Sequence, residues 1–169
     1  MRLAKAPPDG VYARKIHKLL VVPVASAAFI NDNAITDPQN VMRVPILQDV
    51  VVQLFGGKPG WDRWFDAAGL PGPVPPNAIK FDTYNAANAL DMALSGDGLM
   101  LGWSIQCYNA LADGRLRCPF GPVVELDLNY YLMCRLSDAR KGHIKAFIDW
   151  AAAQAALLST VWSLQSDAA

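Results

Sequence analysis

The chain has 169 residues, of which 53% are hydrophobic and 18% charged, so it has ample apolar material for a core and no compositional sign of disorder. Its 15 lysines and arginines balance 15 aspartates and glutamates. This balance argues against a free-standing DNA- or RNA-binding domain, because such domains are usually basic. The length suits one domain, or two small lobes that share a core.

A short apolar run near the amino terminus has the order of a secretion signal but not its length. It follows a basic cluster, residues 14–18, and small residues come after it. The run covers only residues 19–24 and contains Pro23, whereas a secretion signal needs roughly 7–15 apolar residues. We interpret residues 18–24 as a strand buried on both faces, followed by one helical turn over residues 27–31. No run is long enough to span a bilayer, so we expect no membrane partner.

The next stretch contains short apolar segments and one clear helix. The apolar segments cover residues 41–47 and 50–54, and prolines and glycines limit both. Apolar residues then recur at helical spacing, which predicts a helix that opens at residues 59–61 and ends at Gly69. The residues that carry this spacing are Trp61, Trp64, Phe65 and Ala68.

Two helix–strand units follow. Residues 78–81 are predicted to form a strand that feeds a helix, with Asp82 or Thr83 as its N-cap and Gly96 at its end. The predicted core stripe of that helix is Ala86, Leu90, Ala93 and Leu94. The next predicted elements are a strand over residues 99–103, a helix over 105–111 and a tight turn at Asp113-Gly114.

The carboxyl-terminal part contains the clearest strand and the longest helix. Strict alternation of apolar and polar residues predicts a strand over residues 126–136. A long helix follows, because apolar residues then keep helical spacing. Its stripe consists of Ile144, Phe147, Ile148, Ala151, Ala155, Leu158 and Trp162. The alternation of strands and helices along the chain indicates an α/β fold with a largely parallel sheet.

The residues that usually carry catalysis or bind metals form no recognisable pattern. Cys107, Cys118 and Cys134 lie in apolar surroundings and match no zinc spacing, so we expect buried free thiols. His17 and His143 lie in basic settings that we expect to be exposed, without the pattern of a triad or a metal site. We therefore expect no enzyme activity, no metal and no cofactor.

Three glycines resemble a dinucleotide-binding loop only superficially. Gly96, Gly98 and Gly102 follow a predicted helix and lead into a strand. In a dinucleotide-binding loop the glycines follow a strand and open a helix. We therefore interpret these glycines as a helix end and a tight entry into the strand.

A binding site made of backbone and small polar groups is the remaining candidate. Ligands of open α/β sheets lie beyond the carboxyl ends of the strands. The helix that begins near Thr83 would direct N–H groups and its positive dipole end to that place, which suits a carboxylate. The polar or aromatic groups at two neighbouring predicted strand ends are Thr83, Asn85, Trp103 and Ser104. For Thr83 and Ser104, simple helix N-capping is the alternative interpretation.

Four stretches of the chain match one known family in the right order. Residues 81–118 contain a strand end, an alanine-rich helix, a Gly-Asp-Gly turn, a buried strand and the turn Leu-Ala-Asp-Gly-Arg-Leu. The other matching stretches are residues 20–29, 60–69 and 146–150. Together they resemble the effector-binding domain of LysR-type transcriptional regulators. The tryptophan pattern of residues 60–69 is similar to the branch of the glycine-cleavage activator.

The resemblance implies an α/β fold of the periplasmic-binding-protein-like type 2 class, which is a three-layer sandwich. It implies one complete subdomain with crossing strands, residues 19–135, and a partial second one, residues 1–18 and 136–169. The family's amino-terminal helix-turn-helix and the first part of its effector domain have no counterpart in this sequence.

As a function, the resemblance implies a cytoplasmic ligand-sensing and dimerisation module of a LysR-type regulator. It would form a homodimer, bind a small effector such as an amino acid or a carboxylate, and make no direct contact with nucleic acid. The effector-binding residues implied are Ala25, Ser26, Phe81, Asp82, Thr83, Tyr84, Trp103 and Ser104. Two alternatives remain open, a fragment of a periplasmic-type solute-binding protein and a small flavodoxin-like enzyme.

Overall fold

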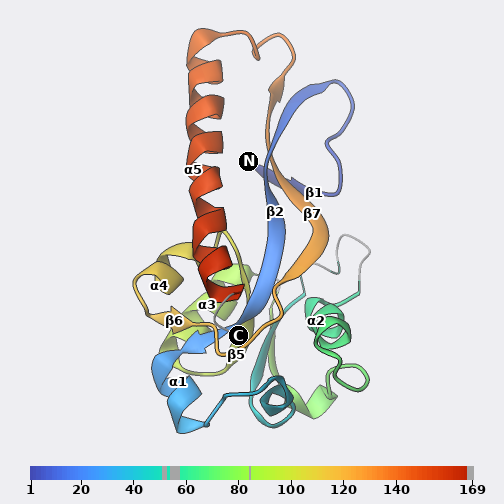
Figure 1. Cartoon of the computed structure of the whole chain (residues 1–169). Coiled ribbons are helices and arrows are strands. Elements are labelled where there is room, and N and C mark those ends of the chain that lie inside the picture. The colour runs from blue at the N-terminus through green and yellow to red at the C-terminus, as the bar shows by residue number, and fades with distance from the viewer. Residues whose placement is uncertain (51–52, 54–57, 84, 167–169) are drawn as a thin grey trace.

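The computed structural model describes residues 1–50, 53, 58–83 and 85–166, with side chains as far as residue 158 (Figure 1). Within these residues one mixed sheet has seven strands, in the order β1-β7-β2-β5-β3-β4, with β6 paired to β2. The strands are β1 (Arg2–Ala4), β2 (Val11–Ser26), β3 (Ile46–Asp49), β4 (Ile79–Thr83), β5 (Leu99–Trp103), β6 (Leu116–Arg117) and β7 (Val124–Arg135). The helices are α1 (Ala27–Asp32), η1 (Pro38–Arg43), α2 (Gly60–Ala68), η3 (Pro76–Ala78), α3 (Ala86–Ser95), α4 (Tyr108–Ala112) and α5 (Gly142–Ser166), where η marks a 3-10 helix.

The sheet is only partly parallel, so the prediction of a largely parallel sheet is wrong. β3 pairs in parallel with β4 and with β5, and α2 and α3 lie in the crossovers between these strands. β7 pairs antiparallel with β1 and β2, and β2 pairs antiparallel with β5. Strands become parallel where a crossover returns the chain in the same direction. The two longest strands, β2 and β7, pair directly with each other instead.

Most predicted helix ends are confirmed, with one correction. α2 ends at Gly69, with a φ of 68°, and α3 ends at Gly96, with a φ of 85°. Both glycines adopt the left-handed conformation that favours glycine after a helix. The predicted N-cap of α3 is wrong, because Asn85 caps it and accepts a backbone N–H of the first turn at 3.0 Å. Asp82 and Thr83 still belong to β4.

Several predicted boundaries move. The strand predicted over residues 18–24 is the buried end of the longer β2. The segment predicted over 41–47 divides into η1 and β3, and α4 begins only at Tyr108. Leu136 lies beyond the end of β7 and is 60% exposed. The segment predicted over 50–54 lies mostly outside the described residues.

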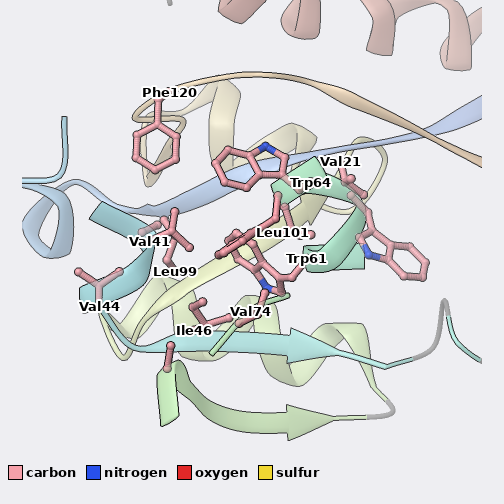
Figure 2. Packing of buried hydrophobic residues seen from close by; sticks show 14 of the residues in the cluster. Val21, Val41, Val44, Ile46, Trp61, Trp64, Val74, Leu99, Leu101 and Phe120 are labelled. Atoms are coloured by element: carbon pink, nitrogen blue, oxygen red, sulfur yellow. The ribbon is translucent and has the colours of Figure 1, made fainter. Parts of the chain in front are cut away.

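Two apolar clusters, one on each face of the sheet, make a three-layer sandwich. Successive strand residues point to opposite faces, so Val21 and Leu101 belong to the first cluster and Val22 and Met100 to the second. The first cluster is completed by the aromatic side chains of α2, which pack against β5 (Figure 2). Ala89 and Ala93 of α3 and Ala110 and Leu111 of α4 complete the second cluster. The predicted three-layer architecture is confirmed.

The long helix α5 stands beside β2 and β7 and lies along one side of the molecule (Figure 1). Ile148 and Ala155 of the predicted stripe are buried, whereas Phe147 is 55% exposed. The side chain of Trp162 lies outside the described residues. The half-buried members of the stripe are Ile144, Ala151 and Leu158. In the part of the chain that the structure describes, no helix is long and apolar enough to cross a membrane.

Candidate functional site

The carboxyl ends of β5, β3 and β4 meet at one edge of the sheet, which we call the carboxyl edge. Asp49, the last residue of β3, lies opposite Thr83, the last residue of β4. The parallel pairing of β3 with β5 brings Trp103 to the same edge, and Ser104 follows it. β3 therefore separates the two strand ends that the sequence suggested were neighbours, and its Asp49 lies between them.

Thr83 shapes the entry to α3. It is buried, and its hydroxyl accepts the backbone N–H of Asn85 at 3.0 Å and donates to the carbonyl of Asn85 at 3.2 Å. Asn85, which is exposed, then caps the helix. Together they place the amino-terminal end of α3, which carries the positive end of the helix dipole, beside the carboxyl edge. The Thr83 hydroxyl thus holds the turn, while the first turn of α3 suits an anion.

Gln106 is a polar residue that lies next to the first turn of α3. Its side-chain N–H donates to the carbonyl of Ala86, the first residue of α3. Its oxygen, Oε1, is buried and has no hydrogen-bond partner among the described residues. A buried acceptor without a donor costs about 1–3 kcal/mol. This oxygen is therefore suited to accept a hydrogen bond from a ligand.

Two tryptophans and a carboxylate enclose a small cavity at the carboxyl edge. Asp49, Trp61 and Trp103 line it, and its volume is about 10 Å³, which is room for about one water molecule. Asp49 also acts on Tyr130. Burial raises the pKa of the Tyr130 hydroxyl, and the negative charge of Asp49 raises it further by a smaller amount. The cavity is much smaller than ligand pockets of roughly 300–1,000 Å³. An effector at this edge therefore needs a second wall.

His17 joins β2 to the end of β5, which corrects the expectation that it is exposed. Its side chain is partly buried, and its Nε2 lies 2.8 Å from the hydroxyl oxygen of Ser104. Ser104 is fully buried, and its backbone N–H donates to the carbonyl of Leu20 at 2.9 Å. Ser104 therefore fixes β2 against β5 and does not cap a helix. His143 is exposed, as expected.

The contact of His17 predicts how stability depends on pH. Burial lowers the pKa of His17 below its usual 6.5, so the folded state favours the neutral ring. The stability that the neutral ring contributes is present above pH 6.5 and is lost as the pH falls through the folded pKa. The unfolding free energy from urea titrations should therefore rise with pH across this window, and His17→Gln should flatten the slope. The same change at the exposed His143 is the control, and an equal loss of slope there would contradict the assignment.

Ala25 and Ser26 lie at the far end of β2 from the carboxyl edge. They pair with β6, and the Ser26 hydroxyl oxygen caps α1 by accepting a backbone N–H at 3.3 Å. Because β2 runs antiparallel to β5, they come beside the beginning of β5, whereas Trp103 stands at its end. The structure therefore does not bring these two residues together with Thr83 and Trp103.

The remaining predicted site residues lie in or directly after β4. Phe81 packs with the cluster beneath α3. Asp82 is exposed and accepts a hydrogen bond from the side-chain amide of Gln48 at 2.8 Å. Tyr84 lies outside the described residues. The predicted residues that the structure brings to the carboxyl edge are Thr83, Trp103 and Ser104.

Sequence reasoning missed Asp49, Gln106 and His17 at this site. Asp49 lies two residues after the apolar segment 41–47, which is a usable signal because ligands of α/β sheets lie at the carboxyl ends of strands. Gln106 lies in a connection and carries no spacing signal. His17 was judged by its basic neighbours in the sequence, while its burial depends on the pairing of β2 with distant strands.

The three cysteines are free thiols, and two of them, Cys107 and Cys118, lack the lowered pKa of an activated nucleophile. Cys107 is buried, as predicted, and Cys118 and Cys134 are partly buried. Burial raises the pKa of Cys107 to about 12 and that of Cys118 to about 11, whereas a reactive cysteine needs a lowered pKa. The described residues contain no group of histidines, cysteines and carboxylates that would hold a metal ion.

Sequence comparison places the chain in a known domain family. The LysR substrate binding domain matches residues 1–156. The glycine cleavage system transcriptional activator of Escherichia coli K12 is 26% identical over 152 residues, which cover 87% of this chain and 46% of the activator. The chain thus spans about half the length of the curated relatives it matches. The predicted similarity to the glycine-cleavage branch is confirmed.

Solved structures show the same fold. The effector domain of AmpR from Pseudomonas aeruginosa superposes with a TM-score of 0.71 at 21% identity, over 92% of this chain and 71% of that one. The AmpR effector-binding domain of Citrobacter freundii gives 0.73 at 18% identity, over 91% and 72%. With the family match, these likenesses favour a regulator domain over a solute-binding fragment or a flavodoxin-like enzyme. The chain belongs to the LysR substrate-binding domain family.

Proposed function

We propose that the chain is the ligand-sensing and dimerisation module of a LysR-type transcriptional regulator. The family match and the activator relatives support this function, and the observation that carries the site is the arrangement of Thr83, Gln106 and the first turn of α3 at the carboxyl edge. The module acts in the cytoplasm and performs no catalysis. It makes no direct contact with DNA, because its 15 basic and 15 acidic residues leave no net positive charge.

The proposed effector is a small carboxylate, with amino acids as the first compounds to test. Its carboxylate would lie at the first turn of α3, where backbone N–H groups and the dipole favour an anion. The unpaired Oε1 of Gln106 would accept a hydrogen bond from an ammonium or hydroxyl group of the same molecule. Trp103 lies at the same edge but is buried in the cluster on the α2 face of the sheet. Ala25 and Ser26 are not part of this proposed site, because they lie at the other end of β2.

The same edge provides a route from effector binding to a change of shape. Ser104 bonds both Leu20 and His17 of β2. The pairing of β2 with β7 is irregular on either side of this contact, with register shifts between Lys15 and His17 and between Lys18 and Leu20. Such irregularities bend a strand locally. If β2, β5 and β7 can take two arrangements, an effector that binds one of them more tightly would increase the population of that arrangement.

Binding of a carboxylate should weaken when a negative charge is added at the start of α3. In the variant Asn85→Asp the cap is kept, since Asp and Asn cap equally well, but the charge repels the ligand. The dissociation constant of the carboxylate, measured by calorimetry with candidate amino acids, should rise at least ~10-fold, which corresponds to about 1.4 kcal/mol.

The matched control for this test is Asn77→Asp. Asn77 is also exposed, and it lies in η3, which leads into the opposite end of β4. The same change of charge there should leave the affinity as it is. Equal affinity of the Asn85→Asp variant and the unchanged protein would place the effector elsewhere.

A further inference from the structure

A second cavity lies at the end of the sheet opposite the carboxyl edge, where β3 and β4 begin. We call it the amino-edge cavity. Ile46 and Ile79, the first residues of these parallel strands, are paired, so the segments that lead into them, η1 and η3, lie side by side and contribute to its walls. Its volume of about 390 Å³ falls within the range of ligand pockets, roughly 300–1,000 Å³.

Two basic residues line the amino-edge cavity without an acidic partner. Arg43 is the last residue of η1 and Lys80 the second residue of β4, and both are exposed. The ion pairs among the described residues all involve other lysines and arginines. No aspartate or glutamate of the described part of the chain lines the cavity. Two positive charges that share a cavity repel each other, whereas an anion between them is attracted by both.

The pairing of β4 with β3 is irregular at Lys80. Ile46 pairs with Ile79 and Leu47 pairs with Phe81, so the register skips Lys80. An extra residue of this kind redirects a side chain, and such bulges are over-represented at sheet edges and next to active sites. β4 is the last strand on its side of the described sheet. The irregularity therefore occurs at a residue that lines the cavity.

The rest of the lining is mainly apolar, and its frame is rigid. Val44, Pro45 and Ala78 line the cavity, and Val44 and Ala78 are buried in the cluster on the α2 face of the sheet. η1 begins at Pro38 with a capping box, and η3 begins at Pro76. Proline fixes the backbone φ, and a preformed site loses little entropy when a ligand binds.

We propose that the amino-edge cavity is a second ligand site, which takes a small phosphate monoester with an apolar body. A phosphate monoester carries up to two negative charges on one group, which match the two basic residues. Arg43 suits two phosphate oxygens at once, and Lys80 acts as a point charge. The apolar body would lie against Val44 and Ala78. This site goes beyond the proposed function, because it shares no residue with the carboxyl edge.

The test is calorimetric titration of the whole chain with phenyl phosphate at low ionic strength, where charge interactions are least screened. At about pH 8 the phosphate is doubly charged. Phenyl phosphate should bind more tightly than benzoate, which has the same ring but one charge, and more tightly than inorganic phosphate, which has no apolar body. Equal binding of benzoate would overturn the proposed preference for a phosphate.

Two substitutions in the cavity should weaken phenyl phosphate binding. Arg43→Gln and Lys80→Gln should each raise its dissociation constant at least ~10-fold, because each removes one of the two charges that hold the phosphate. Asn77→Asp, which adds a negative charge to the lining, should act in the same direction. Lys15→Gln is the control. It removes an exposed positive charge from β2, outside the cavity, and should leave the affinity as it is.

The results separate this site from the carboxyl edge. Weakening in both Arg43→Gln and Lys80→Gln supports the second site even if no amino acid binds at the carboxyl edge. Weakening in Asn85→Asp and in neither of those variants would assign the phosphate to the first turn of α3 and overturn the second site. No binding to the unchanged chain at millimolar phenyl phosphate, or equal weakening by Lys15→Gln, would also overturn it. Because Arg43 and Lys80 are exposed, both variants should fold, and an unchanged urea midpoint verifies this.

Discussion

Replacing Gly102 by valine should prevent the domain from folding. Gly102 lies in the middle of the sheet, in β5. A β-carbon at this position would lie 2.7 Å from a methyl carbon of Val24 and 2.9 Å from the sulfur of Cys107. Both neighbours are fully buried, and neither is a long flexible side chain whose end could swing away. Overpacking of this kind costs about 1–3 kcal/mol for a small addition, and the two further carbons of valine add to it. The loss is large against a total stability of roughly 5–15 kcal/mol.

The measurement is urea unfolding followed by tryptophan fluorescence. Gly102→Ala is the milder variant and should lose about 1–3 kcal/mol of unfolding free energy. Gly142→Ala is the matched control, because a β-carbon at Gly142 meets nothing within 4 Å. A Gly102→Ala variant as stable as the control would show that the packing of β5 against α4 is looser than described.

Replacing Trp64 by alanine should cost about 3–5 kcal/mol, the range for removing a buried aromatic side chain. Trp64 is fully buried in α2 at the centre of the larger cluster (Figure 2). Its ring centroid lies 5.8 Å from that of Trp61, 6.0 Å from that of Phe65 and 5.7 Å from that of Phe120. Its indole N–H also donates to the carbonyl of Pro122 at 2.9 Å, so α2 is tied to the segment that enters β7.

The variant Trp64→Phe separates packing from the hydrogen bond. It keeps an aromatic ring but leaves the carbonyl of Pro122 without its donor, so the expected loss is smaller, and the hydrogen bond accounts for about 1 kcal/mol of it. Both losses should be measured as shifts in the urea midpoint at constant slope. If Trp64→Ala lost less than Trp64→Phe, the described packing of α2 would be wrong.

The sequence by itself determined the elements whose signals are local. The spacing of Trp61, Trp64 and Phe65 predicts α2, and Gly69 and Gly96 mark helix ends at the places where the backbone turns left-handed. β5 has the predicted bounds. Helical period and positive φ depend only on residues a few positions apart, so a single sequence contains the necessary information. The family could be named from four short stretches for the same reason, since each stretch is continuous in the chain.

At the candidate site the strand ends could be predicted from the sequence, but the strands that neighbour them could not. Thr83 and Trp103 were both expected to lie at strand ends, and they do. The structure inserts β3 between them, which brings Asp49 to the carboxyl edge. It also moves Ala25 and Ser26 to the opposite end of the sheet. The order of strands in a sheet depends on pairings between distant residues, and no local pattern encodes them.

Only the tertiary structure decided which polar and apolar side chains are buried. His17, which stands in a basic stretch, is partly buried against Ser104, because β2 lies between β5 and β7. Phe147 belongs to an apolar stripe and is nevertheless exposed, because α5 packs on the rest of the chain along one side only. Hydrophobic periodicity shows which face of an element is apolar, but what covers that face depends on distant parts of the chain or on another molecule.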